Sequence, residues 1–265
     1  MRGARLCSVN AAYIRGSLVE DSSKRLYSGW FVVLAGLFVT CLIVANIIAV
    51  KPIALPGGYA TPAGIVIFPL SYLFGDVLTE VYGYAAARRV IWLGFACNLV
   101  AVIAIWIGGR LPGAAYAGWV PNRQASYADI LGFTPWLLLA SFCAYLVGEF
   151  SNSFVLAKLK IATRGRWLWT RTIGSTFVGE GIDSIIFITI AFGVAQRVPA
   201  HALVTLIVTQ WTLKVLYEIA ATPFTYAAVG FLKRREGQDP FDTRTNFSPV
   251  VFARAARSPK PQVGA

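Results

Sequence analysis

Six long apolar runs constrain the fold of this chain more than any other feature of its sequence. A helix needs about 20 apolar residues to span roughly 30 Å of hydrocarbon. The runs cover about residues 30–50, 62–82, 89–108, 135–157, 172–195 and 202–232. Backbone groups in lipid must hydrogen-bond within their own segment, and the runs lack the period-two alternation of membrane strands. The sequence therefore predicts an all-α, polytopic membrane protein with six transmembrane helices.

The composition supports this class. Hydrophobic residues make up 57% of the 265 residues and charged residues only 14%, whereas a soluble domain carries roughly 25% charged residues. Lys and Arg number 24 against 12 Asp and Glu, a net charge of +12. Such an excess is typical of proteins that bind nucleic acid or face an anionic membrane, and the positions of the charges decide between them.

The basic residues lie mostly in alternate connections between the runs. They occur at 88–89, 158–171 and 233–235, and five more precede residue 30. The other connections hold only Lys51, Arg110, Arg123 and Arg197. The positive-inside rule then predicts that both termini are cytoplasmic, and no nucleic-acid partner is expected.

The chain divides into three predicted parts. Residues 1–29 form a flexible cytoplasmic tail, 30–236 a six-helix membrane transport domain, and 237–265 a second, polar cytoplasmic tail. Residues 1–25 do not read as a signal peptide, because the first apolar run is too long and no small-residue cleavage site follows it. An overlong start is the alternative reading of these residues.

Half of the acidic residues fall inside the predicted spans, where each charge costs roughly 2.5–3.5 kcal/mol. These six are Asp76, Glu80, Glu149, Glu180, Asp183 and Glu218. Several share a helix face with another polar residue, as shown by the spacings Tyr72/Asp76/Glu80, Glu149/Asn152, Glu180/Asp183 and Lys214/Glu218. The pattern favours a polar cavity between helices, with Lys214 and Glu218 as an internal pair. The structural alternative is that single acids pair near helix ends, as Glu80 could with Arg88 or Arg89.

The sequence offers few of the residues and motifs that enzymes use for catalysis. The four cysteines (Cys7, Cys41, Cys97 and Cys143) form no CxxC pair, and His201 is the only histidine. No metal site or cofactor is predicted. HExxH, GxSxG and a nucleotide-binding GxxxxGK[ST] motif are absent, so neither an enzyme nor an ATPase is expected.

A secondary transporter fits the polar set better than a channel, because mixed acid, amide and aromatic groups suit an organic ligand. Two signs favour a 3+3 inverted repeat. Asn46 precedes Lys51 late in the first run as Asn152 precedes Lys158 late in the fourth, and paired acids occupy the second and fifth runs.

Five stretches carry a resemblance to a known family. They are ANIIAVKP (45–52), FPLSYLFGDVLTEVYGYAAARRVIWLGF (68–95), GEFSNSFVLAKLK (148–160), RTIGSTFVGEGIDSIIFITIAFG (171–193) and LKVLYEIAATPFTYAAVGFLKRREGQD (213–239). Over about residues 30–248 the chain resembles the queuosine precursor transporters, also called the vitamin-uptake-transporter-like family. The resemblance implies import of 7-deazaguanines across the bacterial inner membrane for queuosine salvage into tRNA. The expected substrates are 7-cyano- and 7-aminomethyl-7-deazaguanine, or queuine.

The chemistry of a guanine-like ring suits the polar residues of the spans. Its N1–H and amine are parallel donors for one carboxylate, its O6 needs a donor, and its flat face needs an aromatic ring. The predicted substrate-binding residues are Asn46, Tyr72, Asp76, Glu80, Glu149, Asn152, Glu180, Asp183, Lys214 and Glu218. The carboxylate that takes the guanine edge is expected to be Glu149 or one of Glu180 and Asp183. The aromatic candidates are Tyr72, Phe74, Phe187 and Trp211.

Three questions stay open at this level. The runner-up function is a substrate-binding membrane subunit of an energy-coupling-factor importer for a vitamin-like or nucleobase ligand, and a membrane structural factor is a further alternative. Proton symport and facilitated diffusion are both compatible with the acids. A homodimer within the lipid bilayer is also left open, with Gly94 and Ala96 as weak packing signals.

Overall fold

The computed structural model describes residues 28–49, 51–54, 60–112, 122–131, 135–194, 199–243 and 245–249. The chain divides into two compact units, Met1–Val33 and Leu34–Ala265. Of the first unit, residues 28–33 are described; they begin helix α2, and the Phe31 N–H donates to Ser28 Oγ at 3.2 Å. All packing described below lies within the second unit.

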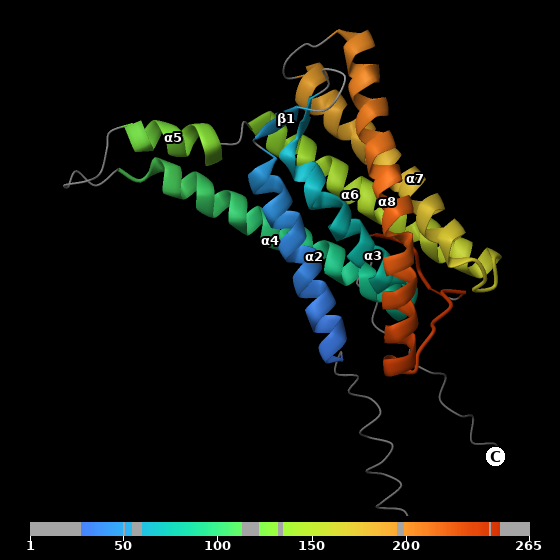
Figure 1. The fold of residues 1–265 in the computed structure, drawn as a ribbon. Coiled ribbons are helices and arrows are strands. Elements are labelled where there is room, and N and C mark those ends of the chain that lie inside the picture. Colours follow the sequence, from blue (N-terminus) through green and yellow to red (C-terminus); the bar gives the residue numbers. More distant parts are fainter. Residues whose placement is uncertain are drawn as a thin grey trace, which may run out of the picture. The chain divides into compact units, whose positions relative to one another are not determined.

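Helices make up most of the described chain (Figure 1). They are α2 (Gly29–Ile48), α3 (Phe68–Tyr82), α4 (Tyr84–Arg110), α5 (Asn122–Leu131), α6 (Pro135–Ala162), α7 (Leu168–Ile188) and α8 (Ala200–Glu236). A 3₁₀ turn, η2 (Ala63–Val66), precedes α3, and a π-helical turn, η3 (Thr189–Val194), extends α7. Strands β1 (Pro52–Ala54) and β2 (Ala60–Pro62) form an antiparallel hairpin after α2, with Ile53 opposite Thr61. The all-α class is thus confirmed, with a small hairpin that the sequence did not reveal.

Five of these helices are long and apolar enough to cross a membrane, namely α2, α4, the 139–162 part of α6, α7 with its π-helical turn, and α8. The predicted run at 62–82 differs, because β2 and η2 occupy its first residues and α3 begins only at Phe68. Pro69 lies in the first turn of α3, where its missing N–H leaves no helical bond unmade. With 15 residues, α3 is about 22 Å long. It is therefore shorter than the hydrocarbon layer, and the chain is a polytopic membrane protein with five helices of spanning length among its described residues.

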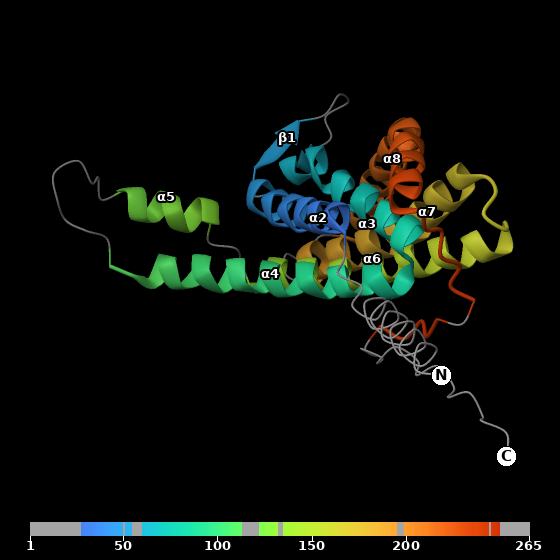
Figure 2. The same cartoon turned by 90° about the horizontal axis from the view of Figure 1, so that it is seen from below.

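The connection between α4 and α6 contains a further helix, α5. Helix α5 lies beside the end of α4 (Figure 2). Tyr127 donates its hydroxyl to the Ile105 carbonyl at 3.1 Å, and Gln124 donates to the Gly109 carbonyl at 3.0 Å. Helix α5 is too short and too polar to span a membrane, so no apolar run in the sequence marks it.

Helices α6 and α7 approach most closely at two glycines. A Cβ on Gly179 of α7 would lie 2.6 Å from Asn152 Cβ and 2.9 Å from the Gly148 carbonyl oxygen of α6. A Cβ on Gly148 would lie 2.8 Å from Asp183 Cβ. Small residues let helix backbones approach in membranes, and here the approach brings polar residues of α6 and α7 together.

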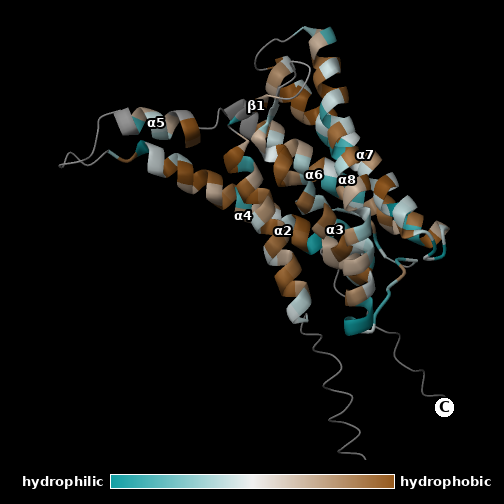
Figure 3. Ribbon diagram, viewed as in Figure 1, coloured by the Kyte–Doolittle hydropathy of each residue, from teal (hydrophilic) through white to brown (hydrophobic). Residues whose placement is uncertain are grey.

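Hydrophobic residues, brown in Figure 3, occur along the long helices, and many large ones are exposed. Val100 and Trp106 of α4 are 66% and 60% exposed, and Phe224 of α8 is 72% exposed. By contrast, the acidic residues of the predicted spans are buried. An apolar exterior around buried charged groups is the arrangement expected of a protein surrounded by lipid.

The residues after α8 fold back onto the start of α4. We call the described residues 237–243 and 245–249 the C-terminal strap. Asp242 accepts a hydrogen bond from the Tyr84 N–H at 2.9 Å, and Arg88 donates to the carbonyls of Asn246 and Ser248 at 2.9 and 2.6 Å. The first part of the predicted tail is therefore packed against the helices that it follows.

Candidate functional site

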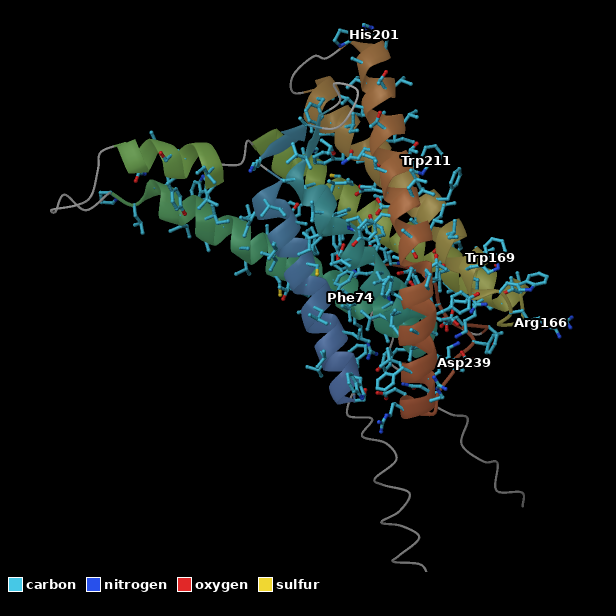
Figure 4. The ribbon with its side chains drawn as sticks, viewed as in Figure 1. Phe74, Arg166, Trp169, His201, Trp211 and Asp239 are labelled. Carbon is cyan, nitrogen blue, oxygen red and sulfur yellow. The ribbon has the colours of Figure 1, made fainter. Side chains whose placement is uncertain are left out.

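All six acids of the predicted spans are buried, with at most 5% of each residue exposed. They fall into two groups at different depths. Glu80 lies near the helix ends where α3 and α6 finish and α7 begins, and we call these ends the basic end. Figure 4 marks it with Arg166, Trp169 and Asp239, and marks the other end of α8 with His201. The remaining five acids lie further from the basic end.

Glu80 is the centre of an ion network at the basic end. Its carboxylate accepts from Arg171 Nη2 and Nε at 2.8 and 3.2 Å, and from Lys233 Nζ at 2.6 Å. Lys160 Nζ donates to the Glu80 carbonyl at 2.6 Å and lies 3.5 Å from its carboxylate. Asp239 of the strap binds Lys160 and Lys233 at 2.5 and 2.9 Å. We call these five residues the ion lock, because they join α3, α6, α7, α8 and the strap.

The ion lock also lowers the pKa of the Asp239 carboxyl group. Partial burial raises the pKa of the Asp239 carboxyl group, but hydrogen bonds from Lys160 and Lys233, together with their positive charge, lower this pKa by more. The net result is a pKa below the usual value for Asp. The alternative prediction that Glu80 pairs with Arg88 is wrong, because Arg88 donates to carbonyl groups of the strap.

A second ion cluster lies away from the basic end and is centred on Lys214 of α8. Lys214 Nζ lies 2.5 Å from Asp183 Oδ2 and 2.6 Å from Glu180 Oε2, both on α7. The Nζ also lies 4.6 Å from the centre of the Phe68 ring. The prediction that Lys214 pairs with Glu218 is wrong. Lys214 pairs instead with two carboxylates of the neighbouring helix α7. The expectation that Lys214 neutralises one or two acids agrees with this geometry.

A pocket reaches this cluster from the half of the bundle remote from the basic end. Its empty space is about 500 Å³, including the part open to the outside. It is lined by Ala45, Asn46, Ala49, Pro62, Gly64, Ile65, Phe68, Ser141, Ala144, Asp183, Phe187, Gln210 and Lys214. The wall thus combines a carboxylate, an ammonium group and two amides with two phenyl rings. Few polar groups on a mostly apolar wall are typical of small-molecule sites.

The late start of α3 contributes to this pocket. Because β2 and η2 replace the first turns of the predicted helix, Pro62, Gly64 and Ile65 face the pocket next to Phe68. Gly64 sits tightly, since a Cβ there would lie 2.8 Å from the Ala45 carbonyl oxygen. The segment formed by β2 and η2 therefore closes one wall of the pocket against α2.

Asn46 of α2 is held in place at the pocket by two neighbours. It donates to Asn98 Oδ1 at 3.1 Å and accepts from the Ser141 hydroxyl at 3.0 Å. Its amide thus has a fixed orientation at the pocket wall. Preorganised polar groups of this kind are what discriminates between ligands of similar size.

Beyond the pocket lies a set of acids with few partners. Asp76 Oδ1 accepts from the Asn152 amide at 2.6 Å, while Asp76 Oδ2, both oxygens of Glu149 and Glu218 Oε1 have no hydrogen-bond partner. The Tyr72 hydroxyl is also buried without one. These three acids, together with Glu180 and Asp183, which pair with Lys214, form what we call the carboxyl cluster.

The ten predicted site residues are therefore distributed over three places. Asn46, Asp183 and Lys214 line the pocket, and Glu180 joins it through Lys214. The next five, which are buried and do not line the pocket, are Tyr72, Asp76, Glu149, Asn152 and Glu218. Glu80 belongs to the ion lock, 12 residues and about 18 Å along α3 from Phe68.

Three residues of the pocket wall are not among the predicted site residues. Phe68, Ser141 and Gln210 line the pocket but carry no formal charge and stood out only weakly among apolar neighbours. Among the aromatic candidates, Phe187 lines the pocket. Trp211 instead donates to the Phe177 carbonyl at 2.9 Å and packs on the Phe177 ring, and it does not line the pocket.

Helices of spanning length, buried charges and a small-molecule pocket together define the class of the protein, a polytopic membrane protein with an internal pocket. The family resemblance is confirmed, because the family described as "Putative vitamin uptake transporter" matches residues 62–228. The chain belongs to this family.

Two curated relatives carry more specific names. The chain is 31% identical to a "Probable queuosine precursor transporter" of Bacillus subtilis (strain 168), over 73% of this chain and 83% of that protein. It is 29% identical to a "Queuosine precursor transporter" of Escherichia coli (strain K12), over 51% of this chain and 57% of that protein. No solved structure matches the chain.

Proposed function

We propose that this protein imports queuosine precursors of the 7-deazaguanine type across the bacterial inner membrane. Both curated relatives are named as queuosine precursor transporters, which favours a carrier over a subunit of an energy-coupling-factor importer. The observation that carries the proposal is the pocket wall, where Asp183, Lys214, two amides and two phenyl rings line the same space.

The pocket residues match a guanine-like ring group by group. The Asp183 carboxylate accepts from the ring N1–H and the exocyclic amine. The amides of Asn46 and Gln210, or the Lys214 ammonium group, donate to O6. Phe68 and Phe187 cover the ring faces. Lys214 then exchanges one of its two carboxylate contacts for the substrate, which keeps its charge compensated throughout.

The position of the pocket supports an outward-facing arrangement. The positive-inside rule assigns the basic end to the cytoplasm, with both termini on that side. The pocket then faces the outside, while the ion lock closes the cytoplasmic side about 18 Å away along α3. Import requires that the ion lock opens when the outer side closes.

The finer architecture belongs to the same proposal. Helix α3 and the preceding hairpin form the sixth membrane segment, a short helix with an irregular entry at the binding site, as transporters use. Helices α2–α4 and α6–α8 are the halves of a 3+3 inverted repeat. The functional domain covers residues 30–236, and residues 1–29 and 237–265 lie in the cytoplasm. The protein binds no nucleic acid. A homodimer is compatible with the mechanism.

Salvage in cells tests this function. A bacterial strain that cannot synthesise queuosine precursors and lacks its own importer is supplied with 7-cyano-7-deazaguanine, and queuosine in tRNA is measured by mass spectrometry. Expression of this chain should restore queuosine, and Lys214→Met should reduce it at least tenfold. Lys158→Met removes a lysine that is exposed on α6 and serves as the matched control. No queuosine with the wild-type chain at normal membrane levels would refute the proposal.

A further inference from the structure

Glu149 has the least compensated carboxylate in the carboxyl cluster. The residue is fully buried, and neither carboxylate oxygen has a hydrogen-bond partner. It faces Gly75 of α3, where a Cβ would collide with Glu149 Oε1. Glu149 does not line the pocket, so its carboxyl group is a feature separate from the proposed substrate contacts.

The groups around Glu149 on α3, α6 and α7 are acids and tyrosines, and none of them carries a positive charge. Helix α7 presents Glu180 and Asp183, and α3 presents Tyr72 and Asp76. Within α6, the Tyr145 hydroxyl is already donated to the Ile91 carbonyl of α4 at 2.8 Å. None of these groups offsets an ionised Glu149.

Helix α8 adds one cation and one further acid. Lys214 is held by Glu180 and Asp183, and Glu218 faces Asp76. The five carboxylates of the cluster and one ammonium group give a formal charge of −4 if every carboxyl group is ionised. A buried, unpaired carboxylate costs several kcal/mol, so the cluster needs further positive charge.

We propose that Glu149 is a proton-binding site and that its proton enters the cell with the substrate. A proton suits the site better than a metal ion, because no three acidic, His or Cys side chains converge as metal ligands within the described part of the chain. A single proton gives Glu149 a neutral carboxyl group that tolerates full burial without ligands. The proposal rests on the proposed function, since it concerns what accompanies the same substrate.

Gly148 links substrate binding at the pocket to proton binding at Glu149. This neighbour of Glu149 packs against Asp183, and a Cβ on it would lie 3.2 Å from the Tyr72 hydroxyl. Substrate at Asp183 and Lys214 draws the one cation of the cluster toward itself and lowers the positive potential at Glu149. This change favours the protonated form, and by reciprocity a proton on Glu149 strengthens substrate binding.

The test uses the full chain in liposomes that contain an entrapped pH dye. With the pH lower outside than inside, the wild-type protein should accumulate labelled 7-cyano-7-deazaguanine at least tenfold more than at equal pH. External substrate should also acidify the lumen. A sodium gradient at equal pH should not replace the proton gradient.

Glu149→Gln gives the specific readout. The ratio of accumulation with and without the pH gradient should fall from at least ten to about one in this variant, whereas the matched control Glu236→Gln keeps the wild-type ratio. Wild-type uptake without lumen acidification would overturn the proton site yet leave the import function standing, and this outcome does not depend on how well the variant folds. Absence of any wild-type uptake would instead refute the import function.

Discussion

Glu80 of α3 and Arg171 of α7 form a buried ion pair through two hydrogen bonds of 2.8 and 3.2 Å, although 91 residues separate them in the sequence. Arg171 also donates to the Arg166 carbonyl at 2.5 Å, within the turn that precedes α7. The pair therefore ties α3 to the connection between α6 and α7. Together with Lys160 and Lys233 it makes Glu80 the only carboxylate in the described chain with three cationic partners.

Replacing Glu80 should destabilise the protein strongly. Glu80→Gln leaves the charges of Arg171, Lys160 and Lys233 without their shared carboxylate, and breaking a buried ion pair typically costs about 3–5 kcal/mol. We expect a clear fall in the thermal unfolding midpoint of the detergent-solubilised protein. Glu236→Gln makes the same chemical change outside the ion lock and should leave the midpoint unchanged. Equal midpoints for both variants would contradict the account of the lock.

The glycine contact between α6 and α7 gives a second prediction. Gly179→Ala places a methyl group against Asn152 and the Gly148 carbonyl, and such overpacking costs about 1–3 kcal/mol. The unfolding midpoint should fall accordingly. Gly36→Ala in α2 meets nothing within 4 Å and should be neutral or slightly stabilising, because Ala favours a helix by about 1 kcal/mol over Gly. A destabilised Gly36→Ala with a normal Gly179→Ala would show that the contact is wrongly identified.

Asp239 predicts a dependence of stability on pH. Because its pKa in the folded protein is lowered, ionised Asp239 stabilises the fold above its ordinary pKa of about 3.9. This stabilisation is lost as the pH falls through the lowered pKa. The Asp239 side chain is 45% exposed, so the effect should stay below about 1 kcal/mol.

The measurement compares wild type and Asp239→Asn by thermal unfolding between pH 3 and pH 7. The wild type should be the more stable near pH 7, and the difference should shrink below about pH 4. A difference that grows as the pH falls would mean that Asp239 does not act through Lys160 and Lys233.

Asp242 of the strap should support the start of α4. Gly83, which precedes α4, has a φ of 83° and no capping side chain, and Asp242 supplies the missing acceptor to the Tyr84 N–H from outside the helix. Losing such a cap costs about 0.5–2 kcal/mol. Asp242→Ala should lower the unfolding midpoint by a corresponding amount, and Asp242→Asn, which keeps an acceptor oxygen, should lower it less. Identical midpoints for all three proteins would argue against a capping role.

The fold could be predicted from the sequence where hydrophobicity alone determines it. The apolar runs at 89–108 and 202–232 correspond to α4 and α8, which extend further because polar and basic residues at their ends also adopt the helix. The run at 62–82 was misjudged, because apolar composition does not distinguish a strand and a 3₁₀ turn from a helix over so few residues. Helix α5 was invisible to a search for apolar runs.

The charged residues of the site could be predicted from the sequence, but their pairings and the uncharged pocket residues Phe68, Ser141 and Gln210 could not. A buried charge is conspicuous in an apolar run, so Asp183 and Lys214 were identified at once. Which carboxylate meets Lys214 depends on how α7 packs against α8, and residue spacing on one helix cannot reveal this. The division between the ion lock and the carboxyl cluster likewise follows from depth along α3, where Asp76 and Glu80 share a face yet have different partners.

The most direct test of import through the pocket is uptake of labelled 7-cyano-7-deazaguanine into liposomes that contain only this protein. Asp183→Asn removes the carboxylate proposed to accept the guanine edge, and hydrogen bonds to a charged group contribute about 1.5–3 kcal/mol. We expect saturable wild-type uptake that unlabelled 7-aminomethyl-7-deazaguanine inhibits, and a reduction of at least tenfold in Asp183→Asn at equal protein content. Wild-type uptake no greater than in protein-free liposomes, or equal uptake by the variant, would contradict the account.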